Sequence, residues 1–140
     1  MNDALETALG ALRYRDMTEH ELRQRLATRG FAEDERDDAI ASLRRTGLLD
    51  DRRFAEGRAA SLAGRGAGDA LIRDALERAG VAPEAVDDAL GALDPEADRA
   101  RAVVERRGGG PKTARYLYGK GFSGETVAEL VASESPNELG

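Results

Sequence analysis

A pattern of leucine, glycine and an apolar residue that recurs three times is the feature that most constrains this fold. The glycines of successive copies are 50 and then 41 residues apart, and a period of this length is typical of repeat proteins. Glycine ends helices because it enters the left-handed conformation without a Cβ penalty, and a leucine four residues earlier lies on the same helix face. The three copies are Leu26, Gly30 and Phe31; Leu76, Gly80 and Val81; and Leu117, Gly121 and Phe122.

Apolar residues recur at steps of three and four along the chain, which predicts helices throughout, and no segment alternates as a strand would. Thr18 followed by Glu21 has the spacing of a capping box. Pro95 fits the first position of a helix, with Asp94 as the cap before it. The expected helices span residues 3–15, 19–29, 33–46, 51–63, 68–79, 83–93, 95–107, 111–119 and 124–133.

Helices in three similar groups predict an all-α protein, an elongated and curved array of three tandem three-helix repeats. The expected repeats are 1–47, 48–94 and 95–140, and the polar tail from Ser133 is expected to fray. Positions that repeat between the groups predict the core. The core candidates are Leu12, Leu26, Phe31, Ile40, Phe54, Leu62, Leu76, Leu90, Leu117 and Phe122.

Several functional classes are excluded by composition. The 140 residues include no cysteine and one histidine, His20, which excludes disulfide scaffolds, thiolate zinc sites, iron–sulfur clusters and a cysteine nucleophile. No apolar run approaches the ~20 residues of a membrane helix, and the first residues do not resemble a signal peptide. We therefore expect a cytoplasmic protein with no membrane association, metal or cofactor.

The glycine-rich stretches 64–68 and 108–113 resemble nucleotide-binding loops superficially. No strand precedes either stretch, so flexible links between helices are the better interpretation. The acidic clusters mostly fall in first turns of expected helices, where they offset the helix dipole, and Asp50 or Asp51 is the expected cap of the helix that contains Phe54. No catalytic constellation remains, and we expect no enzymatic activity.

Positive charge is distributed unevenly. The chain carries 21 Lys and Arg residues against 27 Asp and Glu, a net charge of −6, yet residues 95–120 hold seven basic and three acidic residues. This segment is suited to phosphates or an acidic protein surface, although an ordinary solvated helix face has the same composition. At least one of Tyr116 and Tyr118 is expected to pack in the core. A second, weaker basic group is Arg13, Arg15, Arg23, Arg25 and Arg29.

Taken together, the motifs resemble the RecX family, regulators of the bacterial recombinase RecA. The opening pattern runs from Ala11-Leu12 through Thr18 and Glu21-Leu22 to Arg29-Gly30-Phe31. The most specific motif is Leu49-Asp50-Asp51-Arg52-Arg53-Phe54-Ala55, and Tyr116-Leu117 through Lys120-Gly121-Phe122 resembles the closing repeat of the family. Nearly the whole chain is covered by these motifs in the family's order.

The resemblance implies a monomeric, non-catalytic protein that binds in the helical groove of the RecA–DNA filament and suppresses strand exchange and ATP hydrolysis. It also implies that Asp50, Asp51, Arg53 and Phe54 are mainly structural. Where the family often has a basic stretch in its second repeat, this chain retains Arg65 and Arg73. The residues expected to contact RecA or DNA are Arg65, Arg73, Arg106, Arg107, Lys112, Arg115 and Lys120.

Two other functions remain open at this point. Three-helix units resemble helix-turn-helix modules, so residues 95–120 predict a small DNA-binding protein that binds single- or double-stranded DNA weakly. A helical array is also compatible with an adaptor for another protein. Affinity for DNA without RecA, and its dependence on salt, distinguish these hypotheses.

Overall fold

The computed structural model describes residues 3–134, and these form nine α-helices joined by short turns, with no strand among them. The all-α fold is confirmed, and each expected helix is present with ends within two residues of the expected ones. The helices are α1 (Asp3–Tyr14), α2 (Glu19–Thr28), α3 (Glu33–Arg45), α4 (Asp51–Gly64), α5 (Asp69–Arg78), α6 (Pro83–Gly91), α7 (Glu96–Arg107), α8 (Pro111–Gly119) and α9 (Gly124–Glu134).

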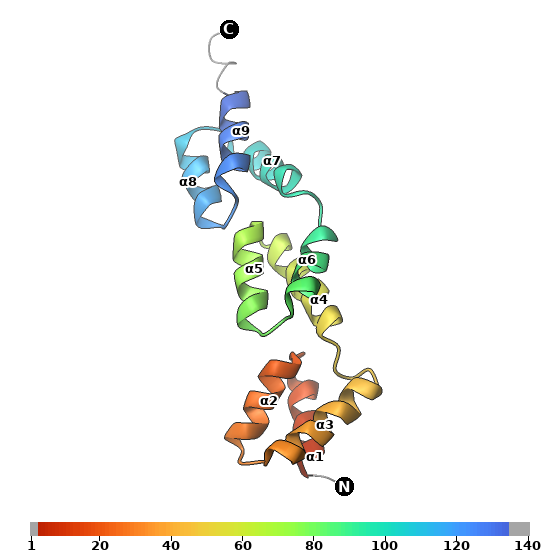
Figure 1. The fold of residues 1–140 in the computed structure, drawn as a ribbon. Coiled ribbons are helices and arrows are strands. Elements are labelled where there is room, and N and C mark those ends of the chain that lie inside the picture. The colour runs from red at the N-terminus through yellow and green to blue at the C-terminus, as the bar shows by residue number, and fades with distance from the viewer. Residues whose placement is uncertain (1–2, 135–140) are drawn as a thin grey trace.

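The helices lie in three groups, α1–α3, α4–α6 and α7–α9, stacked along one axis with the first and third groups at opposite ends (Figure 1). Each group has its own cluster of buried apolar side chains. Leu49, which the expected boundary assigns to the second repeat, packs in the first cluster. The boundaries after residues 47 and 94 stay predictions. Of the tail expected to fray from Ser133, residues 135–140 lie outside the described residues.

Local capping explains where the helices begin. The Thr18–Glu21 capping box is confirmed, because each side chain accepts the backbone N–H of the other residue at 3.1 Å. The expected cap at Asp94 is wrong. Pro95 has an extended ψ of 142° and is itself the cap residue, so the Asp94 side chain lies one residue too far from the first free amides of α7.

The second helices of the groups, α2, α5 and α8, are stacked end to end along one side of the molecule (Figure 1). We call the α2–α5 contact the first joint and the α5–α8 contact the second joint. At the first joint, the buried Thr18 hydroxyl donates to the Ala79 carbonyl. At the second joint, the Gly68 amide donates to the Lys120 carbonyl at 2.7 Å, and the Ala70 amide to the Gly121 carbonyl at 3.1 Å.

Glycine allows the close approach at both joints. A Cβ on Gly80 would lie 2.3 Å from His20 Cβ, and a Cβ on Gly121 would lie 2.7 Å from the Leu71 backbone nitrogen. Both glycines have positive φ, 86° and 89°, so they end α5 and α8 in the left-handed conformation. The recurring glycines therefore end the helices and also allow the next group to pack there.

We predict that Gly68→Ala destabilises the second joint. The added Cβ would lie 2.4 Å from the Phe122 backbone nitrogen, which cannot move away, while the Gly68 φ of −84° suits alanine. The expected loss is about 1–3 kcal/mol in urea unfolding. Gly64→Ala is the control, because no atom lies within 4 Å of its Cβ, and it should be neutral or stabilising. Equal effects of the two substitutions would contradict this assignment.

Candidate protein and nucleic-acid interface

Three of the basic residues expected to bind meet beside the second joint. The Arg107 guanidinium lies 3.7 Å from the centroid of the Tyr116 ring, a cation–π contact. A Cβ on Gly66 would lie 3.7 Å from both Tyr116 Oη and Lys120 Cε, so these two side chains cover the α4–α5 turn. Arg65, in the same turn, donates to the Ser61 side chain at 3.0 Å. The tertiary structure thus gathers Arg65, Arg107 and Lys120, which are up to 55 residues apart in sequence.

A second concentration of positive charge surrounds the α7–α8 turn. Arg106, Lys112 and Arg115 are exposed, and the described residues provide no hydrogen bond or ion pair to their side chains. Lys112 and Arg115 are one turn apart on α8, so they share a face. Together with Arg107 we call these residues the basic end. It is open to an anionic partner.

Helix α8 departs from the charge pattern of the other helices. Each of the other eight described helices has an acidic residue in its first turn, whereas α8 has none and carries Lys112 there. A cation at the amino end of a helix is unfavourable for the helix dipole. A position that breaks a local stability rule is a candidate for function.

Arg73 lies apart from these groups and is already paired. Its guanidinium is 3.0 Å from the Asp87 carboxylate on α6, and Arg23 pairs with Asp37 in the first group at 2.5 Å. Because the two pairs are 50 residues apart in sequence, they are one repeated contact between the second and third helices of a group. Arg73 therefore has a packing role besides any role in binding.

The Asp50–Phe54 motif lies at the first joint and holds its backbone. Asp50 caps α4 by accepting the Arg53 amide at 3.1 Å, and Arg53 donates to the Gly47 carbonyl at 2.9 Å. Phe54 is buried in the second cluster. These contacts join the end of α3 to the start of α4.

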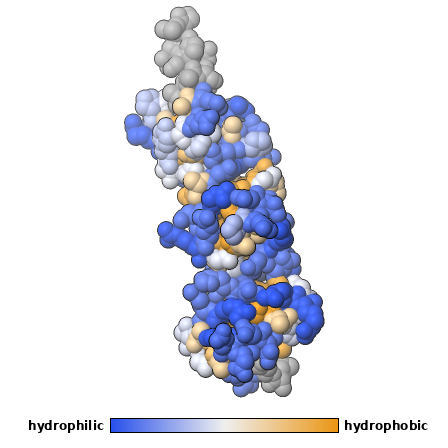
Figure 2. Space-filling model, viewed as in Figure 1, coloured by the Kyte–Doolittle hydropathy of each residue, from blue (hydrophilic) through white to orange (hydrophobic). Residues whose placement is uncertain are grey.

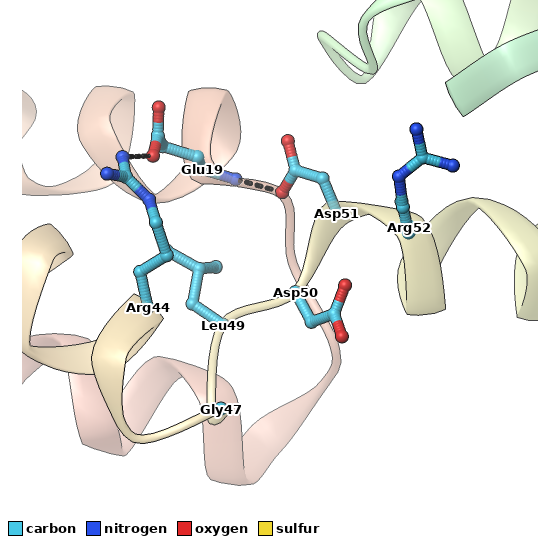
Figure 3. Close-up of a pocket in the computed structure, with 7 residues that line it drawn as sticks. All are labelled: Glu19, Arg44, Gly47, Leu49, Asp50, Asp51 and Arg52. Atoms are coloured by element: carbon cyan, nitrogen blue, oxygen red, sulfur yellow. Dashed lines mark hydrogen bonds and ion pairs between the residues drawn. The ribbon is translucent and has the colours of Figure 1, made fainter. Parts of the chain in front are cut away.

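Asp51 joins the first two groups directly. Its carboxylate accepts the Glu19 backbone amide at 2.9 Å, and the Glu19 carboxylate pairs with Arg44 (Figure 3). Asp51, Glu19 and Arg44 line an open pocket of about 320 Å³, and Asp50 and Arg52 line it as well. Burial raises the pKa of Asp51, although the Glu19 amide lowers it in part, and the hydrogen bond to Glu19 raises the pKa of Arg44.

Glu96 has the equivalent role at the second joint. Its carboxylate accepts the Asp69 amide at 2.8 Å, the Ser123 amide at 3.2 Å and the Thr126 hydroxyl at 3.1 Å. Burial alone raises the pKa of Glu96, but the hydrogen bonds from Asp69, Ser123 and Thr126 outweigh it and hold the pKa below its usual value. One carboxylate thus connects α5, α7 and the start of α9.

Arg99 completes this joint beside Glu96. Its side chain donates to the Ala67 carbonyl at 2.9 Å, pairs with Asp69 and lies 5.9 Å from the Phe122 ring centroid. Sequence reasoning did not identify Glu96 and Arg99 as joint residues, nor Thr18 as more than a helix cap. The one available signal was an acidic residue at the first position of both α4 and α7.

The structure shows an elongated α-helical repeat protein with a concentration of basic side chains around α8. Among the described residues, no three metal-ligating side chains are grouped as a metal site, and no helix is long and apolar enough to cross a membrane. His20 is exposed beside the first joint. Tyr116 packs against the third cluster while Tyr118 is 53% exposed, as expected for one packing tyrosine.

Comparison with known proteins gives the family. Residues 4–43 match the family model of the first three-helix domain of RecX, and residues 50–90 match that of the second. The regulatory protein RecX of Halorhodospira halophila is 35% identical, over 96% of this chain and 91% of the relative. The regulatory protein RecX of Trichlorobacter lovleyi is 32% identical, over 92% of this chain and 94% of the relative. The chain therefore belongs to the RecX family of regulatory proteins.

Solved structures agree on the fold. The crystal structure of RecX from Lactobacillus salivarius superposes with a TM-score of 0.80 over 95% of both chains, at 20% sequence identity. A second RecX crystal structure gives a TM-score of 0.78 over 94% of this chain and 72% of the other. At these identities the likeness extends to the fold of the three helical groups.

We predict that Glu96→Gln weakens folding in a pH-dependent way. The amide forms weaker hydrogen bonds than the carboxylate, and we expect a loss of about 1 kcal/mol at pH 7 for this partly buried group. Because the folded-state pKa is lowered, the carboxylate stabilises the fold above its unfolded pKa of about 4.3 and loses this effect as the pH falls through the folded pKa.

Urea unfolding of the wild type and Glu96→Gln at neutral pH and below pH ~4 measures this difference, which should shrink in acid. Glu125→Gln, in the first turn of α9, is the matched control and should have little effect at either pH. If Glu96→Gln lowered the free energy of unfolding equally at both pH values, the result would contradict a role for the ionised carboxylate.

Proposed function

We propose that this chain is a non-catalytic regulator of RecA that binds along the groove of the RecA–DNA filament and suppresses ATP hydrolysis and strand exchange. The observation that carries the proposal is membership of the RecX family over nearly the whole chain. We expect the protein to act in the cytoplasm, as a monomer and without a cofactor.

The shape of the molecule is compatible with this role. Three helical groups in line expose side chains along the length of the stack, and a filament groove repeats its binding surface with each subunit (Figure 1). Contacts that are individually weak add up when they lie on one chain, because each one raises the effective concentration of the next. An elongated array thus binds a polymer better than a single subunit.

The basic residues supply the proposed contacts. We assign the basic end, together with Arg65 and Lys120 at the second joint, to the filament surface, and Arg73 to its margin because of its pairing with Asp87. Charge of this sign attracts both phosphates and acidic protein surfaces. The chain as a whole is acidic, so the contact is confined to this region.

ATP hydrolysis by RecA on single-stranded DNA, titrated with this protein, is the direct test. We expect suppression at well below one molecule per RecA subunit, since a protein that blocks filament growth acts through many subunits. Circular dichroism verifies that the chain is folded. Unchanged hydrolysis with folded protein would contradict the proposal.

We predict that Lys112→Glu with Arg115→Glu weakens binding to DNA-loaded RecA by about tenfold or more, equivalent to ~1.4 kcal/mol. Both side chains are exposed and unpaired among the described residues, so the fold should be unchanged. Arg25→Glu with Arg29→Glu changes the net charge equally at exposed positions near the end of α2, whose side chains also have no hydrogen bond or ion pair with the described residues, and serves as control. Equal affinities of the two double variants would remove α8 from the interface.

Direct DNA binding by residues 95–120 is the second candidate function, favoured by the basic first turn of α8. It predicts affinity for duplex DNA without RecA that falls steeply as salt rises, because phosphate contacts release counterions. A fluorescence titration at several salt concentrations measures this slope. A flat response would leave the RecA filament as the partner of the basic end.

A further inference from the structure

The two joints differ in whether side chains fill the space beside the contact between the second helices. At the first joint, an open hollow of about 350 Å³ lies between the α1–α2 turn and helices α4 and α5. Its apolar lining is formed by Phe54, Leu71, Ala75 and Ala79, of which Phe54 and Ala79 belong to the buried core of the second group. The floor of the hollow is therefore part of the packed core of the second group.

The equivalent space at the second joint is occupied by the chain itself. The spacing of 41 residues from Gly80 to Gly121 places Tyr116 where the first joint has Ala75, and Lys120 where it has Ala79. Both long side chains reach the turn at Gly66. The hollow at the first joint is open where two alanines stand in place of a tyrosine and a lysine, so it has room for a large side chain such as the tyrosine of the second joint.

Charged groups surround this apolar floor. Arg15 is 3.4 Å from Glu21, Arg78 is 2.8 Å from Asp74, and the Arg58 side chain has no ion pair or hydrogen bond with any described residue. The rim holds three arginines and two carboxylates, so its net charge is positive. Arg58 is the arginine whose charge has no partner among the described residues.

The mixed signs of the rim decide between two anionic partners. A nucleic-acid backbone carries a negative charge at every phosphate and would meet Glu21 and Asp74 as well as the arginines. A peptide presents carboxylates at some positions and an apolar side chain at another, so it fits an apolar floor whose rim carries both signs. Apolar residues appear as small patches on a largely hydrophilic surface in Figure 2, which suits a single anchor rather than a broad apolar interface.

We propose that this hollow, between Arg15, Arg58 and Arg78, binds one aromatic or large aliphatic side chain of an acidic peptide segment from a partner protein. The anchor takes the place that Tyr116 fills at the second joint, and carboxylates beside it pair with Arg58. This inference goes beyond the proposed filament binding and does not require that the partner be RecA.

Nuclear magnetic resonance on the full ¹⁵N-labelled chain tests the proposal. The probe is a short synthetic peptide with one tryptophan at its centre and glutamates on both sides, and the control probe has alanine in place of tryptophan. We expect the tryptophan peptide to shift the amide signals of Leu71, Ala75 and Ala79 with a Kd of about 1 mM or tighter, and the alanine peptide to bind at least about tenfold more weakly.

Ala75→Tyr fills the hollow with the residue that the second joint uses and should abolish these shifts. Ala102→Tyr, on an exposed position of α7, adds the same side chain elsewhere and should bind as the wild type does. Arg58→Glu should weaken the peptide by about tenfold, whereas Arg25→Glu, exposed on α2 and outside the hollow, should not. Because the Arg58 side chain has no partner among the described residues, we expect this substitution to leave the fold intact, so that binding can still be measured.

The proposal is overturned if the tryptophan peptide shifts no signal in the hollow, or if Ala75→Tyr binds it as well as the wild type does. An oligothymidine that shifts the same signals while the peptide does not would also overturn it in favour of a nucleic-acid site. None of these measurements contains RecA, so filament binding and peptide binding succeed or fail separately.

Discussion

The contact between the carboxyl end of one second helix and the amino end of the preceding one governs how the groups stack. Helix ends leave backbone amides and carbonyls without partners, and burying them unpaired is costly. Here each joint pairs carbonyls at the end of one second helix with donors at the start of the preceding one, and the helix dipoles align head to tail. The stack therefore extends without a shared hydrophobic core.

The two joints meet the same requirement with different groups. Thr18 supplies a hydroxyl that also caps its own helix, whereas Gly68 supplies its backbone amide and needs to lack a Cβ. A carboxylate from the following group then accepts the next amide, Asp51 in one joint and Glu96 in the other. The second joint adds Arg99, Tyr116 and Lys120 and is filled, while small residues leave the first joint open. Differences in side-chain volume at equivalent positions thus turn one structural contact into two distinct surfaces.

Charge follows a similar division between structure and function. Acidic first turns stabilise the other described helices, and Arg23–Asp37 and Arg73–Asp87 are one repeated ion pair within two groups. The third group has Ala114 and Ala128 at the corresponding positions and carries free cations on α8 instead. The candidate interface lies where charges are not used for packing, which is the physical reason for favouring the basic end over Arg73.

The amino-acid sequence by itself determined the nine described helices, their stops, the Thr18–Glu21 cap and the basic character of residues 95–120. It also named ten core positions, of which six are buried and four are partly buried against the same clusters. These features depend on spacings of three or four residues and on glycine conformations, which are local. The tertiary structure alone decided that Thr18 meets Ala79, that Glu96 connects three helices and that Tyr116 and Lys120 cover Gly66. Those partners lie 27 to 61 residues apart, and their contact depends on how helix ends pack in space, for which no local spacing exists.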